Sequence, residues 1–219
     1  MAEFVVHTVP GSPYGRAVLA ALEEKGAPYR VARVDPRMRN EPSHLALHPF
    51  GRVPVLDHGE FRLYETQAIL RYLDRVLTQP PLTPADPRQA ARMDQLMNIN
   101  DWYLFLGFSR IVVFQRIVGP RLTGSTPDEA AIAAAMPAGN TVVAEIARLL
   151  GENRFLVGAE LSLADLIVAP QIDMLAQTPE WAELVAPHAK LRSWLERMLE
   201  RVSFRATTWE RVTALAAAA

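Results

Sequence analysis

Cysteine is absent from the 219-residue chain. Its absence excludes structural disulfides, thiolate metal sites and any mechanism in which a thiol of the protein is the nucleophile. An excess of one charge is also lacking, because 23 basic and 24 acidic residues give a formal net charge of -1. Without a block of about five or six like charges, the sequence has no electrostatic footprint for nucleic acid, and we expect no nucleic-acid partner.

Long apolar runs are missing as well. The first residues, Met1-Ala2-Glu3-Phe4, carry no basic segment, and no apolar run approaching the roughly 18 residues of a membrane span follows them. We therefore expect a cytoplasmic protein with no membrane partner. Metal binding is not expected either, because the spacing of the histidines is unsuited to it, namely that of His7, His44, His58 and His188.

A hydrophobic content of 50% over this length is enough for one large domain or two small ones. The first part of the chain alternates between strand and helix patterns, in the order β-α-β-α-β-β-α. The predicted elements are strands at 4–6, 29–34, 53–56 and 61–63, and helices at 17–25, 38–47 and 65–77. This order matches a thioredoxin-like α/β domain, although other small α/β sheets fit the pattern too.

Four prolines fall within eight residues, at Pro80, Pro81, Pro84 and Pro87. Such a segment cannot continue a helix, so we predict a domain at 1–77, a linker at 78–87 and a second domain at 88–219. The second domain reads as an all-α bundle with helical runs near 88–118, 127–150, 162–178, 187–202 and 207–217. Within it, Ser162 and Asp165 have the spacing of a helix capping box and are interpreted as structural.

Ser12 stands directly before Pro13, which by itself indicates a helix N-cap with proline in the first turn. A helix N-terminus also stabilises a nearby anion through free N-H groups and the helix dipole. A thiolate is such an anion. With no G-x-S-x-G motif in the chain, serine hydrolase chemistry is not expected.

The segments 12–18, 49–54 and 64–69 together resemble the glutathione-binding half of a cytosolic glutathione S-transferase. The resemblance covers almost the whole chain, and the spacing after Ser12 is similar to that of the serine-type phi, theta and delta classes. It implies glutathione as co-substrate, no prosthetic group, and a homodimer. The activity it implies is conjugation of the glutathione thiolate to a small hydrophobic electrophile, typical of detoxification.

The resemblance also implies roles for particular residues. The Ser12 hydroxyl would donate to the sulfur, with Tyr14 as the alternative donor. Backbone groups of Val53, before a cis Pro54, would pair with the cysteinyl unit as an added strand does. Glu65 and Thr66 would hold the γ-glutamyl end. The glycyl carboxylate needs a cation, and the candidates, each of which is equally well a solvated surface arginine, are Arg39 and Arg52.

An apolar pocket for the electrophile is expected from aromatic residues, most of which otherwise form the bundle core. The candidates are Tyr14, Tyr103, Phe108 and Trp209. His48 replaces the asparagine that often precedes Pro-Phe-Gly in the phi class, and we interpret it as structural or exposed. Two alternatives stay open: peroxide or disulfide reduction through bound glutathione, and a transferase-like module that binds without catalysis.

Overall fold

The structure, a computed structural model, describes residues 3–38 and 40–218. The chain forms two compact units. The first runs to Leu82 and takes up the chain again from Leu199, and the second comprises Thr83–Met198. The chain leaves the first unit at Leu82, where the backbone N-H donates to Asp74 Oδ1 at 2.9 Å.

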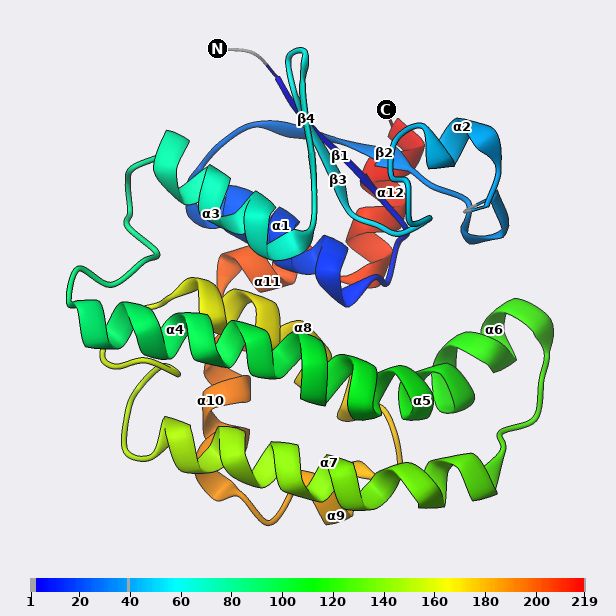
Figure 1. Ribbon diagram of the computed structural model, residues 1–219, viewed down its shortest axis with the longest axis vertical. Helices are drawn as coiled ribbons and strands as arrows, with labels where there is room; N and C mark the ends of the chain where they lie inside the picture. The colour runs from blue at the N-terminus through cyan, green and yellow to red at the C-terminus, as the bar shows by residue number, and fades with distance from the viewer. Residues whose placement is uncertain (1–2, 39, 219) are drawn as a thin grey trace. The chain divides into compact units, whose positions relative to one another are not determined.

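The first unit is built on a four-stranded sheet of order β2-β1-β3-β4. Figure 1 labels its strands. Its strands are β1 (Phe4–Thr8), β2 (Tyr29–Arg33), β3 (Val55–His58) and β4 (Phe61–Tyr64). β1 pairs parallel with β2 and antiparallel with β3, and β3 pairs antiparallel with β4. The predicted thioredoxin-like α/β domain is confirmed. The predicted strand at 53–56 begins only at Val55, because Pro54 has no N-H to donate to a ladder.

The helices of this unit follow from apolar spacing. They are α1 (Pro13–Glu24), the short η1 (Pro36–Met38) and α2 (Pro42–Leu45), and α3 (Thr66–Val76). α3 buries Ile69, Leu70 and Leu73, which recur at helical spacing and so form one face. α1 contacts both α3 and β1. Burial of each such side chain contributes roughly 1.5 to 3 kcal/mol.

Two C-terminal helices, α11 (Val202–Ala206) and α12 (Trp209–Ala218), also belong to the first unit. α11 contacts α1, and α12 contacts β2. The guanidinium of Arg201 forms a two-pronged ion pair with Glu24, with both N···O distances at 2.7 Å. The sequence had placed 88–219 in a single helical domain. Helical periodicity predicts the helices themselves but does not say which unit their apolar faces cover.

The second unit is all helical, as expected. It contains α4 (Pro87–Ile99), η2 (Asn100–Ser109), α5 (Arg110–Val113), η3 (Phe114–Val118), α6 (Gly119–Thr123), α7 (Glu129–Leu150), α8 (Leu163–Leu175), α9 (Trp181–Leu184) and α10 (Ala189–Leu199). The segments from α4 to α6 follow without a break, and η2 and η3 within them are π-helical. The sequence predicted a helical run there but not the π-helical segments.

The capping box at the start of α8 is confirmed. Asp165 Oδ2 accepts from the Ser162 backbone N-H at 2.9 Å, and Asp165 Oδ1 accepts from Trp194 Nε1 and from the Leu156 N-H, both at 2.8 Å. The carboxylate is fully buried, and burial raises its pKa while these donors lower it. Asp165 therefore ties the helix start to the preceding loop and to α10.

α7 is long and apolar enough, by length and composition, to cross a membrane. It contacts η2 and α5, and its buried side chains include Ile132, Val143 and Ile146. The core helix of a helical unit has the same length and composition, so α7 is weak evidence for a membrane span.

Candidate functional site

Three loops of the first unit meet at one edge of its sheet. His7 of β1 lies opposite Val55 at the start of β3, and Val55 lies opposite Tyr64 at the end of β4. The end of β1 leads to Ser12, Val55 follows the Val53-Pro54 bond, and Tyr64 precedes Glu65 and Thr66. Strand register alone therefore brings together the three segments that the sequence analysis singled out.

Ser12 is the N-cap of α1, with extended backbone angles of φ -68° and ψ 119°. Its Oγ accepts from the Gly15 N-H at 3.1 Å, and its own N-H donates to Val9 O at 3.0 Å. The side chain is half-buried. A hydroxyl that accepts from a backbone N-H keeps its own proton available to donate, so the cap does not use up the donor.

Close packing fixes the turn before and after Ser12. A β-carbon on Gly15 would lie 2.0 Å from Thr8 Oγ1, which brings the first turn of α1 directly against β1. Gly11 adopts φ +86°, and a β-carbon there would lie 2.4 Å from Trp209 of α12. Both positions therefore require glycine, and Trp209 covers the residue before the cap.

The N-terminus of α1 is electropositive. Its first turn carries no acidic residue, and Arg16 lies in that turn. Arg16 donates to Phe204 O at 3.1 Å, and its Cζ lies 5.1 Å from the centre of the Phe204 ring. A fixed guanidinium adds to the positive end of the helix dipole, so an anion bound at this terminus is favoured.

The Val53-Pro54 peptide bond is cis, as the resemblance implies. Val53 is half-buried and Pro54 is buried, whereas the side chain of Arg52 is exposed. The Arg52 carbonyl accepts from His44 Nε2 at 3.0 Å. The segment that leads into β3 is therefore anchored just before the residue whose backbone would pair with a ligand. Arg39, the other candidate for the glycyl carboxylate, lies outside the described residues.

The backbone of Glu65 has φ +71° and ψ 110°. Residues other than glycine rarely adopt such a left-handed φ. Its carbonyl accepts from the Ile69 N-H at 2.9 Å, so this strained residue begins α3 as its N-cap. Glu65 is exposed, while Thr66 is 8% exposed at the first position of the helix. Strain of this kind costs of order 1 to 3 kcal/mol and is typical of functional sites.

His48 is structural, which is one of the two readings that the sequence allowed. It is 2% exposed, and its Nδ1 accepts from the Phe50 N-H at 3.3 Å. Its ring lies 4.7 Å from the ring of Tyr64, between centroids. Burial is the main cause that lowers the pKa of this imidazole, so the neutral form is favoured.

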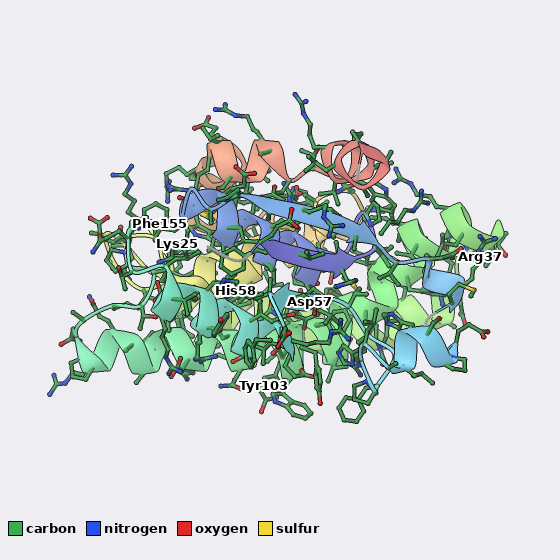
Figure 2. The ribbon with its side chains drawn as sticks, turned by 90° about the horizontal axis from the view of Figure 1, so that it is seen from above. Lys25, Arg37, Asp57, His58, Tyr103 and Phe155 are labelled. Carbon is green, nitrogen blue, oxygen red and sulfur yellow. The ribbon has the colours of Figure 1, made fainter. Side chains whose placement is uncertain are left out.

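The electrophile candidates occupy different environments in the two units. In the first unit Tyr14 and Trp209 are both half-buried. In the second unit Tyr103 is 65% exposed and points away from its helix (Figure 2). Phe108 is fully buried, and its ring would lie 2.6 Å from a β-carbon on Gly139 of α7. Phe108 thus belongs to the core of the helical unit and presents no surface to a ligand there.

Among the residues that the structure describes, no group of three or more His, Asp or Glu side chains is placed to hold a metal ion. Two of the histidines make side-chain contacts within the sheet unit. His7 Nε2 lies 2.9 Å from Asp57 Oδ2, and His58 Nδ1 lies 2.8 Å from the hydroxyl of Tyr72. Asp57 and His58 are neighbours on β3 (Figure 2).

Comparison with known proteins agrees with this arrangement. The family model for the glutathione S-transferase N-terminal domain matches residues 11–76, and the model for the C-terminal domain matches residues 98–201. Glutathione S-transferase F14 of Arabidopsis thaliana is 30% identical over 87% of this chain and 77% of its own length. Glutathione S-transferase 3 of Zea mays is 29% identical over 94% of both chains.

Solved structures are similar over the same extent. A glutathione S-transferase III in apo form superposes with a TM-score of 0.83 at 30% identity, covering 94% of this chain and 95% of that one. A glutathione S-transferase-I bound with lactoylglutathione gives 0.81 at 26% identity, covering 98% and 100%. The sheet unit and the all-helical unit thus have the fold of the glutathione S-transferases. The chain belongs to the glutathione S-transferase family.

Sequence reasoning missed several contacts of this site. The packing of Trp209 on Gly11 joins residues at opposite ends of the chain, and no local pattern points to it. The positive φ of Glu65 was also missed, since an acidic residue before a helix reads as an ordinary cap. The sequence did point to His48, because a histidine stands there in place of the asparagine that often precedes Pro-Phe-Gly in the phi class.

Proposed function

We propose that the protein conjugates the thiolate of glutathione to small hydrophobic electrophiles. The observation that carries the proposal is the meeting of Ser12, Val53 and the Glu65-Thr66 helix start at one sheet edge. These segments offer a hydroxyl, the backbone N-H and C=O of Val53 just before β3, and a helix N-terminus. They match the thiol, the peptide backbone and the terminal carboxylate of one tripeptide.

Ser12 acts on the thiol as a donor. A free thiol titrates near about 8.5, so only a few per cent is ionised at neutral pH. The Ser12 hydroxyl and the positive end of α1, with Arg16 in its first turn, stabilise the thiolate and lower the thiol pKa. The thiolate sulfur attacks the electrophile, and the proton of the thiol leaves to solvent. Tyr14 is the alternative donor.

The rest of the tripeptide is held by backbone and helix groups. Val53 N-H and C=O pair with the cysteinyl unit as an added strand would. Thr66, through its hydroxyl and N-H, holds the γ-glutamyl carboxylate, and Glu65 binds the ammonium. Arg52, exposed beside this edge, or Arg39 holds the glycyl carboxylate. The candidates for contact with the apolar electrophile are Tyr14 and Trp209 in the first unit and Tyr103 in the second. Phe108 is left out of this set because its ring is fully buried.

We further propose that the protein is a cytoplasmic homodimer with a role in detoxification. Large exposed side chains on the first unit favour an interface there, with Phe50 at 69% and Phe61 at 49% exposed. Sedimentation at micromolar concentration tests this proposal. A species at twice the chain mass of 24.3 kDa is expected, and a species at the chain mass itself contradicts it.

Calorimetric titration with glutathione tests the proposed function, with Thr66→Ala as the variant. Loss of one charge-assisted hydrogen bond should weaken binding by about 1.5 to 3 kcal/mol. Thr213→Ala on α12 is the matched control, since the Thr213 hydroxyl donates to Trp209 O at 2.8 Å on an exposed surface. Equal affinity of the Thr66 variant and the wild type would remove Thr66 from the site.

An assay panel with glutathione and aryl halides, epoxides, hydroperoxides and mixed disulfides then identifies the reaction. Turnover of the aryl halides or epoxides supports conjugation. Turnover of hydroperoxides or disulfides alone would replace it with reduction on the same site. Binding of glutathione without any turnover would indicate a non-catalytic module.

A further inference from the structure

A pair of buried histidines supports the loop that leads to Val53 in the proposed glutathione site. His44 and His48 are 5% and 2% exposed, and both lie in the segment around α2. His44 Nε2 meets the carbonyl of Arg52 at 3.0 Å, and His48 Nδ1 meets the N-H of Phe50 at 3.3 Å. The side chains of these residues therefore bind the backbone of residues 50–52, which precedes Val53.

The two imidazoles play opposite hydrogen-bonding roles. A carbonyl oxygen only accepts, so His44 Nε2 carries a proton and donates. A backbone N-H only donates, so His48 Nδ1 accepts and is unprotonated, which places the proton of neutral His48 on Nε2. Protonation of His48 puts a hydrogen on Nδ1 and removes the acceptor, whereas protonation of His44 leaves its donor in place.

His48 also connects this loop to the other half of the site. Its ring lies against Tyr64, which pairs with Val55 in the sheet and directly precedes Glu65 and Thr66. The same side chain thus contacts the end of β4 and holds the loop that leads to Val53. The charged and titratable groups that act on it are Glu65, which favours its protonation, and His44 and Arg52, which disfavour it.

We propose that neutral His48 is a positioning residue that sets the loop before Val53 against the Glu65-Thr66 helix start, in the register that binds glutathione. The inference rests on the proposed function, because it assigns the ligand of this edge. In this proposal the affinity for glutathione depends on the protonation of His48, although His48 need not touch the ligand. Burial lowers the pKa of His48 below the ordinary histidine value of about 6.5, so the acceptor is intact at neutral pH and is lost in acid.

Paired variants separate the hydrogen bond from the rest of the side chain. His48→Asn keeps an uncharged acceptor, because Asn Oδ1 is as many bonds from Cα as His Nδ1. His48→Phe keeps an aromatic ring against Tyr64 but has no acceptor. His58→Asn is the matched control, since His58 lies in the same sheet unit and bonds to Tyr72 instead. Near-ultraviolet circular dichroism and thermal melts establish that each variant is folded.

The ligand probe is S-hexylglutathione, titrated by calorimetry between about pH 5 and pH 7. Its thiol is blocked, its carboxyls titrate below about 4 and its amine above about 7.7, so the charge of the ligand changes only slightly over this range. At pH 7 we expect wild-type affinity for His48→Asn and a roughly three- to tenfold loss for His48→Phe, the range of one hydrogen bond. As the pH falls far enough to protonate His48, the wild type and His58→Asn should lose affinity while His48→Asn keeps it.

The hydrogen-exchange rate of the Phe50 amide measures, in the absence of ligand, whether this loop is held by His48. At equal pH, exchange should be faster in His48→Phe than in the wild type and should return to the wild-type rate in His48→Asn. Equal exchange in all three proteins, or parallel pH profiles for the wild type and His48→Asn, would overturn the role of His48. No binding of the probe by a wild type whose Phe50 amide is protected would instead reject the proposed function.

Discussion

The indole of Trp209 lies against Gly11, one residue before the proposed catalytic Ser12. A β-carbon at residue 11 would lie 2.4 Å from Trp209 Cε3, and the backbone there has φ +86°. Both residues belong to the sheet unit, although almost the whole chain separates them. The last helix of the chain therefore fixes the turn that presents the Ser12 hydroxyl.

We expect Gly11→Ala to destabilise the protein more than an ordinary glycine substitution does. Alanine at residue 11 must adopt a left-handed φ, and its methyl group must also displace an aromatic ring. The displacement adds an overpacking cost of about 1 to 3 kcal/mol. Gly26→Ala is the matched control, with φ +61° and no atom within 4 Å of the added carbon. Urea unfolding of both variants measures the difference. Equal losses would mean that Trp209 moves aside without cost.

Ser12→Ala should raise the pKa of the bound glutathione thiol and lower turnover at neutral pH by tenfold or more, about 1.4 kcal/mol in the activation free energy. Glutathione affinity should change little, because the other contacts remain. Thiolate absorbance during a pH titration of the complex gives the pKa directly.

The variant also loses a helix cap worth around 1 kcal/mol. Asp86→Ala controls for this effect, since Asp86 caps α4 by accepting from the N-H groups of Arg88 and Gln89. It should lose stability without a change in thiol pKa. A folded Ser12→Ala protein with the wild-type thiol pKa and turnover would transfer the donor role to Tyr14.

Asp165→Ala should destabilise the helical unit by about 3 kcal/mol or more. The substitution leaves the Trp194 indole N-H and the Leu156 N-H buried without their acceptor, and each such group costs about 1 to 3 kcal/mol. Asp128→Ala is the comparison, because Asp128 caps α7 through one exposed bond, from the Ala131 N-H at 3.0 Å. That change should cost around 1 kcal/mol. Similar unfolding midpoints for the two variants would contradict the bonding assigned to Asp165.

The sequence by itself determined the features that depend on residues close to one another along the chain, namely strands, helices and helix caps. Alternating apolar residues predicted the sheet, the spacing of Ile69, Leu70 and Leu73 predicted α3, and Ser162 with Asp165 predicted the cap of α8. The resemblance to glutathione transferases added the cis bond at Pro54, against the general preference of X-Pro bonds for trans. Local propensity has no means of reporting that bond, since the surrounding fold selects the isomer.

Only the tertiary structure decided which distant residues share a surface. Strand register brought Ser12, Val53 and Thr66 to one edge, and packing placed Trp209 on Gly11 and buried Phe108 against Gly139. The C-terminal helices joined the sheet unit for the same reason. The sequence shows that an apolar helix face is to be buried. The free energy of burial does not depend on which apolar surface covers that face. The shapes of the surfaces and the connections of the chain therefore decide which surface it packs against.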